Sequence, residues 1–175
     1  MISERLTDRD FDAVYAIMEK SFPEDERRTY EEQRALLADS SYYLYGVKDE
    51  ATGELLGFAA FRVFPEFLFF EHLAVNPNCR NGGIGKKLLD KVKELADGPV
   101  CLEVELPTTE IAARRIAYYE RNGFYLNEYP YVQPSLKKGG EDVPMYIMTT
   151  GRKLTMQEHF FVRDILYQRV YHVEG

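Results

Sequence analysis

Cysteine and histidine are scarce in this sequence of 175 residues, which holds two cysteines and three histidines. Cys79 and Cys101 lack the close spacing of a thiolate metal site or of a Cys-x-x-Cys redox pair, and the histidines are scattered. The sequence therefore predicts no structural metal, and the two isolated cysteines favour a reducing, cytoplasmic setting.

Long uninterrupted apolar runs are also absent. The most apolar region, residues 55–75, is broken by Arg62, Pro65, Glu66 and Glu71, so it is not expected to span a membrane. The N-terminal segment is charged within its first five residues and lacks the apolar core of a signal peptide. We therefore expect no membrane partner.

Positive charge is outnumbered by negative charge. Twenty-two lysines and arginines against 29 acidic residues give a formal net charge of −7, which disfavours general binding to the phosphates of a nucleic acid. A small local anion site is still compatible with this balance, because it needs only a few backbone N–H groups and one or two cations. The remaining composition, 45% hydrophobic and 29% charged, is that of an ordinary globular domain.

Hydrophobic periodicity and turn residues predict a mixed α/β fold. The first part is expected to contain four antiparallel strands, with two helices between the first and second. A strand–helix–strand unit then implies a parallel β-α-β crossover, followed by another helix and two closing strands. The expected strands are residues 1–6, 41–48, 55–64, 67–75, 100–106, 124–132 and 143–149. We expect one domain over residues 1–150.

Residues 151–175 are expected to form a helical extension of the same domain. Thr155 and Glu158 have the spacing of a capping box at its start. Its apolar residues form more hydrophobic surface than a free helix should expose, so it either packs on the domain or joins two subunits in a homodimer. These residues are Phe160, Phe161, Ile165, Tyr167 and Tyr171.

A glycine-rich turn, residues 80–87 with the sequence RNGGIGKK, follows the fourth expected strand. Its glycines permit positive φ and leave backbone N–H groups accessible, and the start of a helix adds a positive dipole end. Arg80 and Lys86 add positive charge, so pyrophosphate is the expected ligand. The spacing is that of neither a Rossmann motif nor a P-loop, and a plain turn between strand and helix remains the alternative.

Two segments resemble motifs of one family. Residues 75–89, VNPNCRNGGIGKKLL, resemble the acetyl-CoA-binding motif of GNAT-type N-acetyltransferases, in which Q/R-x-x-G-x-G/A follows Val-x-Pro. Residues 117–124, AYYERNGF, resemble the family's FYEK-x-GF segment. The resemblance covers roughly residues 1–150, where the order of elements is similar to the family's mixed, splayed sheet. One departure is Ala112, which stands where the family often has an asparagine that contacts the pantetheine arm.

The resemblance implies acetyl-CoA as co-substrate, no metal, and transfer of an acetyl group to a primary amine by direct attack in a ternary complex. It also implies a bulge in the strand before the glycine turn, which frees backbone groups for the pantetheine arm and the acetyl carbonyl. The cofactor-binding residues implied are Leu73, Ala74 and Val75 for that arm, and Arg80, Asn81, Gly82, Gly83, Ile84, Gly85 and Lys86 for the pyrophosphate.

Acetyl transfer to an amine also needs acid–base groups. Glu71 is the first candidate base, because burial in its strand is expected to raise its pKa towards neutrality. An ion pair with an arginine is the alternative. Glu103 and Glu105 lie two residues apart on the expected strand 100–106, either as competing bases or as a binding site for a cationic amine. Tyr119, in the second motif, is the candidate acid.

The acceptor site is less defined. In the family, the elbow between the first two helices forms one wall of this site, which implicates Phe22, Glu26 and Tyr30. The elbow is charged with both signs, so it predicts neither a cationic nor an anionic acceptor. We expect a small-molecule amine as substrate. A protein or peptide acceptor, and a non-catalytic CoA-binding sensor, are the alternatives.

Overall fold

The computed structural model describes residues 1–79 and 82–173. These residues form two compact units, which divide between Gly98 and Pro99, and each unit is described by itself. The domain boundaries expected from the sequence, 1–150 and 151–175, remain a prediction.

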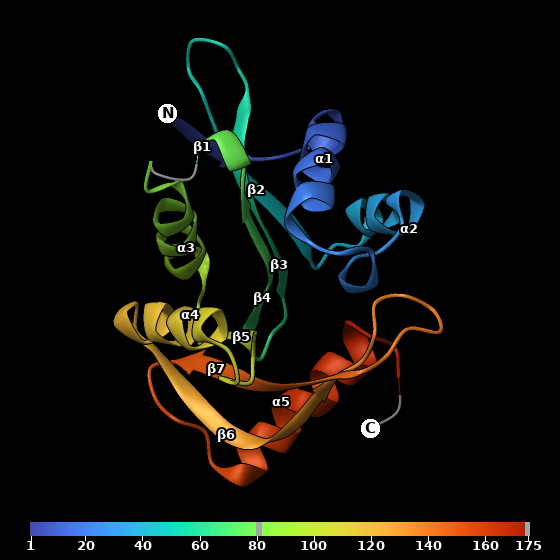
Figure 1. The fold of residues 1–175 in the computed structure, drawn as a ribbon, viewed down its shortest axis with the longest axis vertical. Coiled ribbons are helices and arrows are strands. Elements are labelled where there is room, and N and C mark those ends of the chain that lie inside the picture. Colours follow the sequence, from blue (N-terminus) through green and yellow to red (C-terminus); the bar gives the residue numbers. More distant parts are fainter. Residues whose placement is uncertain (80–81, 174–175) are drawn as a thin grey trace. The chain divides into compact units, whose positions relative to one another are not determined.

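The first unit is built on an antiparallel sheet in the order β1-β2-β3-β4. Helices α1 and α3 lie on opposite faces of this sheet (Figure 1). Every residue from Leu55 to Arg62 of β3 is consequently buried. The elements are β1 (Ile2–Arg5), α1 (Phe11–Ser21), α2 (Tyr30–Ala35), β2 (Tyr42–Lys48), β3 (Leu55–Val63), β4 (Leu68–Val75) and α3 (Ile84–Leu95).

Two apolar layers hold this unit together. On one face, Phe11 and Met18 of α1 pack against Phe58 of β3. On the other face, α3 lies so close to β3 that a Cβ on Gly57 would sit 2.9 Å from Ile84 Cγ2. A side chain at residue 57 would therefore require the Ile84 side chain, in the first turn of α3, to shift.

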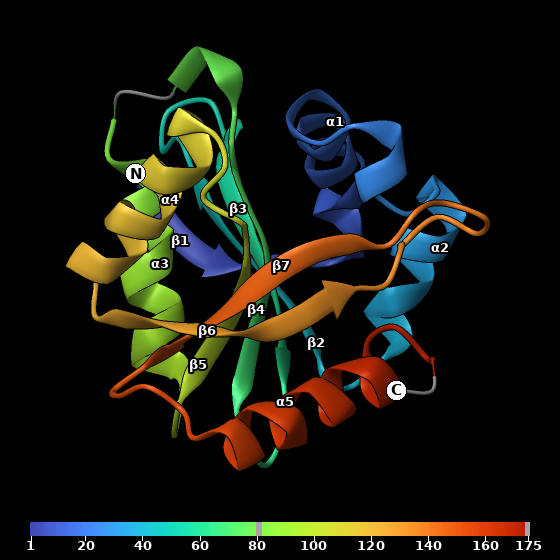
Figure 2. The ribbon, with the colours of Figure 1, turned by 60° about the horizontal axis from the view of Figure 1, so that its bottom comes forward.

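The second unit contains a sheet in which β7 pairs antiparallel with both β5 and β6. Helix α5 runs alongside β6 (Figure 2), so the C-terminal extension packs on its own unit. The Tyr129 hydroxyl donates to Leu154 O at 3.0 Å, and the Tyr167 hydroxyl to Val132 O at 2.5 Å. The elements are β5 (Val100–Glu105), α4 (Glu110–Arg121), β6 (Phe124–Gln133), β7 (Val143–Thr150) and α5 (Met156–Arg169).

Local capping signals in the sequence correspond to real helix ends. Thr29 and Glu32 form the capping box of α2, and Thr155 and Glu158 that of α5. Thr109 Oγ1 accepts from the backbone N–H of the third residue of α4 at 3.1 Å. Each cap satisfies backbone N–H groups that have no partner inside the helix.

Candidate active site

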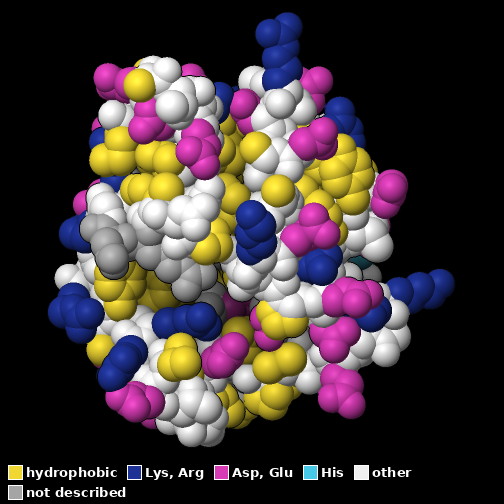
Figure 3. Space-filling view, turned by 45° about the horizontal axis from the view of Figure 1, so that its top comes forward, with side chains coloured by type: hydrophobic (Ala, Val, Ile, Leu, Met, Phe, Trp, Pro, Cys, Tyr) yellow, Lys and Arg dark blue, Asp and Glu magenta, His cyan; other side chains and the backbone are white. Residues whose placement is uncertain are grey.

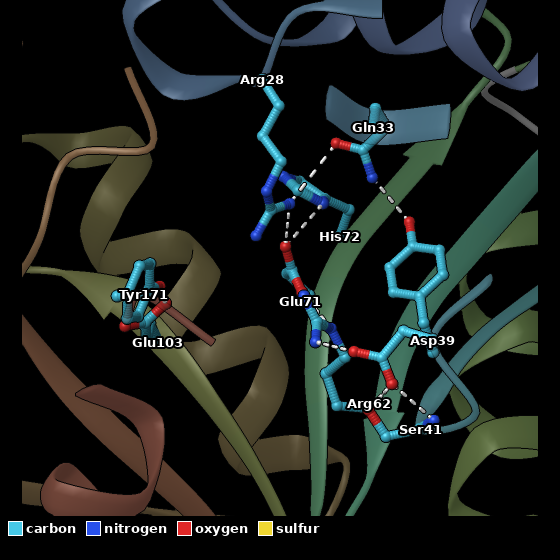
Figure 4. Close-up of polar contacts among 10 residues, drawn as sticks. Arg28, Gln33, Asp39, Ser41, Arg62, Glu71, His72, Glu103 and Tyr171 are labelled. Atoms are coloured by element: carbon cyan, nitrogen blue, oxygen red, sulfur yellow. Dashed lines mark hydrogen bonds and ion pairs between the residues drawn. The ribbon is translucent and has the colours of Figure 1, made fainter. Parts of the chain in front are cut away.

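Glu71 occupies an irregular position in β4. Ala60 of β3 pairs with His72 and Phe61 pairs with Phe70, so Glu71 is an extra residue with no partner on β3. Such a bulge changes the direction of the side chains around it. In Figure 4, Glu71 and His72 both point toward the guanidinium of Arg28, although adjacent residues of a regular strand face opposite ways.

Two arginines hold the Glu71 carboxylate. Arg28 Nη1 donates to Oε1, and Arg62 Nε donates to Oε2 at 3.1 Å. The three side chains are nearly inaccessible, with exposed fractions of 3% for Glu71, 9% for Arg28 and 1% for Arg62. Because Arg28 lies in the elbow between α1 and α2, this cluster ties the elbow to β4.

The cluster extends to neutral and partly exposed groups (Figure 4). Arg28 Nη1 also lies 3.4 Å from Gln33 Oε1, and Gln33 Nε2 donates to the Tyr42 hydroxyl at 2.7 Å. Arg62 Nη1 donates to Asp39 Oδ2 at 3.4 Å. The sequence held one signal for this network, since Arg62 is the only charged residue in the buried part of β3 and a buried charge requires a partner.

The expected rise in the pKa of Glu71 is wrong. Burial does act to raise the pKa, but the positive charges of Arg28, of His72 in its protonated form and of Arg62 outweigh it in that order, and the pKa falls to about 2. His72 Nδ1 lies 3.9 Å from Glu71 Oε1. Burial lowers the pKa of His72 to about 4, so this histidine is neutral at pH 7. The Glu71 side chain is therefore ionised at neutral pH and is a weak proton acceptor.

The glycine turn is described from Gly82 onward; Arg80 and Asn81, expected at the pyrophosphate, lie outside the described residues. Gly83 is the N-cap of α3 and is left-handed, with φ 69° and ψ 18°, a conformation that favours glycine. Gly85, within α3, does not have a positive φ. Lys86 is exposed and its Nζ lies 3.0 Å from Asp90 on the next turn.

The backbone of Leu73, Ala74 and Val75 is regular on its β3 side. These residues pair in sequence with Ala59, Phe58 and Gly57. The expected bulge is therefore present in β4, but on this side it lies at Glu71 rather than within 73–75. The role of 73–75 toward a pantetheine arm remains a prediction.

Tyr119 is half-buried on α4. Its ring contacts Tyr118 and Phe124, with centroids 5.5 and 5.6 Å away. Within the described part of the chain, its hydroxyl has no hydrogen-bond partner. Burial raises the pKa of this phenol to about 12, so it is protonated and available as a donor at neutral pH. Ala112 is buried near the start of the same helix and has no polar side-chain group.

Glu103 of β5 accepts three side-chain hydrogen bonds within its own unit. Tyr131 donates to Oε2, while Gln133 Nε2 and the Tyr171 hydroxyl donate to Oε1 at 2.9 and 2.6 Å. Burial, and then the charge of Glu103, raises the pKa of Tyr131. Glu105 is exposed at the end of the strand. Sequence reasoning missed all three donors, because they lie 28 to 68 residues from Glu103.

The three elbow residues differ in their surroundings. Phe22 contacts the ring of His72 at 5.0 Å between centroids, which places it beside the Glu71 cluster. Tyr30 packs on Phe11, and its hydroxyl donates a hydrogen bond to Asp12 Oδ1. Glu26 is exposed. A role for these residues in an acceptor wall remains a prediction.

The described residues show no further class of site. No three histidine, cysteine or acidic side chains among them gather as metal ligands would, and no described helix has the length and apolarity needed to cross a bilayer. On the face drawn in Figure 3, acidic and basic side chains are interspersed.

Comparisons with known proteins agree with the two motifs. The family model described as "Acetyltransferase (GNAT) family" matches residues 11–124. The Bacillus subtilis (strain 168) protein "Putative acetyltransferase YjbC" is 33% identical over 113 residues, which cover 63% of this chain and 55% of that relative. The chain thus spans about half the length of the curated relative.

Solved structures agree as well. A "Putative acetyltransferase from GNAT family" of Bacteroides thetaiotaomicron superposes with a TM-score of 0.89 and 33% identity, covering 99% of this chain and 100% of the other. An aminoglycoside 6'-N-acetyltransferase complexed with coenzyme A shares the fold at 18% identity, with a TM-score of 0.61 and coverage of 86% and 96%. These matches confirm the mixed α/β fold expected from the sequence, and the chain belongs to the GNAT acetyltransferase family.

Proposed function

We propose that this protein transfers the acetyl group of acetyl-CoA to the primary amine of a small molecule, by direct attack in a ternary complex. The observation that carries the proposal is the left-handed Gly83 at the N-terminus of α3. Gly83 provides no side-chain cap, and the first N–H groups of a 12-residue helix have no partner inside the helix. Helix N-termini with such donors bind phosphate groups.

Acetyl-CoA supplies an acetyl group activated as a thioester. Attack by an amine forms the C–N bond and breaks the C–S bond, so the sulfur gains charge while the nitrogen loses a proton. Tyr119 is protonated and lies in the second motif. Because its pKa of about 12 exceeds that of an ordinary thiol, about 8.5, Tyr119 would stabilise the leaving sulfur as a hydrogen-bond donor rather than lose its proton permanently.

Glu71 has a different role in this proposal from that of general base. A carboxylate with a pKa of about 2 is too weak a base to take a proton from an ammonium group near neutral pH. Its two ion pairs instead connect Arg28 of the elbow with Arg62 of β3. We therefore assign to Glu71 the positioning of the elbow beside β4, and Glu103 and Glu105 remain the candidate bases.

The test is release of free CoA from acetyl-CoA with a panel of small primary amines, peptides and lysine-containing proteins. Turnover of small amines supports the proposal. Turnover of peptides alone favours a protein N-acetyltransferase. Tight CoA binding, seen as thermal stabilisation, with no acceptor in the panel favours a CoA-binding sensor.

A further inference from the structure

The elbow between α1 and α2, residues 22–29, contains an arginine that has no acidic partner among the described residues. Arg27 is half-buried, and no described carboxylate forms an ion pair with it. The next residue differs, because Glu71 binds the guanidinium of Arg28. The positive charge of Arg27 is therefore not neutralised within the part of the chain that the structure describes.

Two contacts hold the Arg27 guanidinium in one orientation. Its Nε donates to Phe22 O at 3.3 Å, and its Nη1 donates to the Tyr15 hydroxyl at 3.2 Å. Tyr15 is 7% exposed and donates its own hydrogen to Arg28 O at 2.7 Å, so its oxygen is left to accept from Arg27. Nη2 has no hydrogen-bond partner among the described residues. A guanidinium fixed in this way loses less conformational entropy when it binds a carboxylate.

His72, on β4 beside the same elbow, provides an independent observation. Its side chain is 6% exposed, and neither ring nitrogen forms a hydrogen bond with a described residue. Nδ1 is inaccessible and lies 3.9 Å from Glu71 Oε1. Nε2 is not among the inaccessible unpartnered atoms, so it is the ring nitrogen that a ligand can reach. Buried polar groups normally have a partner, and the accessible Nε2 indicates where one binds.

The Glu71 carboxylate determines which nitrogen of this ring carries the hydrogen. A neutral imidazole has one N–H, and the negative charge beside Nδ1 favours the hydrogen on that atom. The lone pair then lies on Nε2, which accepts a hydrogen bond. Such an acceptor suits the N–H of an amino group and disfavours the oxygens of a carboxylate.

Phe22 connects the two groups. Its ring centroid lies 5.0 Å from that of His72, and its carbonyl oxygen accepts the hydrogen bond from Arg27. The hydrogen-bond acceptor on β4 and the positive charge of the elbow thus contact opposite ends of a single residue. One small molecule with an amino group and an anionic group is able to reach both.

We propose that Arg27 binds a carboxylate of the acceptor while His72 Nε2 accepts a hydrogen bond from its reacting amino group. The substrate is then a small amino acid with these two groups at opposite ends of a short chain. Guanidinium and carboxylate form two parallel hydrogen bonds, which orient the ligand as well as add affinity. All residues of this site belong to the first unit. The inference rests on the proposed acetyltransferase activity for the identity of the reacting group.

The test compares amino acids with their uncharged carboxamides. The probes are β-alanine, 4-aminobutanoate, 5-aminopentanoate and 6-aminohexanoate, each paired with the carboxamide of the same length. They are titrated by calorimetry into the full chain saturated with CoA, so the readout does not require turnover. Arg27→Gln is matched with Arg34→Gln, which removes the same charge from an exposed arginine whose guanidinium lies 5.6 Å from the Phe11 ring centroid.

We expect wild type to bind at least one acid about ten times more tightly than its carboxamide, the scale of hydrogen bonds to a charged group. Arg27→Gln should reduce this ratio to within about twofold of unity and leave the carboxamide affinity unchanged, whereas Arg34→Gln keeps the ratio. Tyr15→Phe removes the hydroxyl that holds the guanidinium. It should lower the ratio about threefold, and it replaces Arg27→Gln if that variant does not fold.

His72→Phe tests the other end of the ligand. This variant keeps a ring against Phe22 but loses the nitrogen that accepts from the amino group. Because each acid and its carboxamide share that amino group, both should bind about three- to tenfold more weakly, with their ratio unchanged. An effect on the ratio alone would contradict this assignment.

Equal affinity of wild type for every acid and its carboxamide, or the same ratio in Arg27→Gln as in Arg34→Gln, would overturn the inference. Its failure is distinct from failure of the proposed function. Acetylation of amines with no preference for a carboxylate contradicts the inference alone. Binding of an acid that depends on Arg27, with no CoA release from any amine, contradicts the acetyltransferase activity alone.

Discussion

Arg28 Nη1 donates a hydrogen bond to Glu71 Oε1 across 43 residues of sequence, and the two side chains are only 9% and 3% exposed. Arg62 binds the other oxygen of the same carboxylate. A charge removed from water is costly unless it is paired, so each member of this group depends on the others. Three of the predictions below concern Glu71 and His72 beside it.

Replacing Glu71 with glutamine should lower stability strongly. The substitution keeps the volume of the side chain but leaves Arg28 and Arg62 buried without their carboxylate. Breaking a buried ion pair costs about 3–5 kcal/mol, and urea unfolding at pH 7 measures it. Glu158→Gln is the control, because its ion pair with Arg152 lies at the surface. An equally small effect of both substitutions would contradict the role of Glu71.

Lowering the pH should remove the contribution of Glu71 to folding stability over a defined pH range. A carboxyl whose pKa falls from 4.5 to about 2 on folding stabilises the folded state by on the order of 3 kcal/mol at neutral pH. The unfolded chain takes up the proton first, so this stability is complete above pH 4.5 and is lost as the pH falls toward 2. Denaturant titrations at several pH values should show this slope in wild type and a smaller one in Glu71→Gln.

His72 should affect folding stability over a higher pH range than Glu71 does. Burial lowers its pKa from 6.5 to about 4, so the neutral ring is favoured in the folded state. Its stabilisation is complete above pH 6.5 and declines as the pH falls to about 4. His72→Gln should reduce the slope of stability against pH in this window. Part of the slope should persist, because the pKa of His159 is also lowered by burial.

Replacing Tyr119 with phenylalanine should lower kcat by roughly 10- to 100-fold, the scale of losing one transition-state hydrogen bond. Thermal stabilisation by CoA should be unchanged, since only the hydroxyl is lost. Tyr118→Phe, on the adjacent residue, is the control and should retain the wild-type kcat. Steady-state kinetics with the fastest amine of the panel measures both, and wild-type turnover in Tyr119→Phe would remove this residue from the mechanism.

Replacing Gly83 with alanine should weaken CoA binding. The left-handed backbone costs an alanine about 1 kcal/mol, and relaxation of the strain would move the N-cap of α3. Gly53→Ala is the matched control, because Gly53 has a similar φ of 74° and open space around it, but lies in the turn between β2 and β3. Both variants should lose similar stability, and only Gly83→Ala should lose thermal stabilisation by CoA.

Much of the fold could be predicted because its signals are local. The capping boxes at Thr29 and Thr155 depend on residues three positions apart. The glycine turn and α3 are likewise continuous in sequence, so their order after β4 could be predicted. The register shifts at Glu71 and after Asn127 could not, because each depends on which residues of another strand lie opposite.

The sequence by itself determined which chemical groups are present: a carboxylate on β4, a tyrosine in the second motif and glycines before α3. Only the tertiary structure decided the state of those groups. Desolvation alone would raise the pKa of Glu71, and the opposite result follows from the guanidinium delivered by the elbow, the neighbouring His72 ring in its protonated form and the guanidinium on β3. Coulomb energy depends on distance in space, and distance along the chain does not determine it.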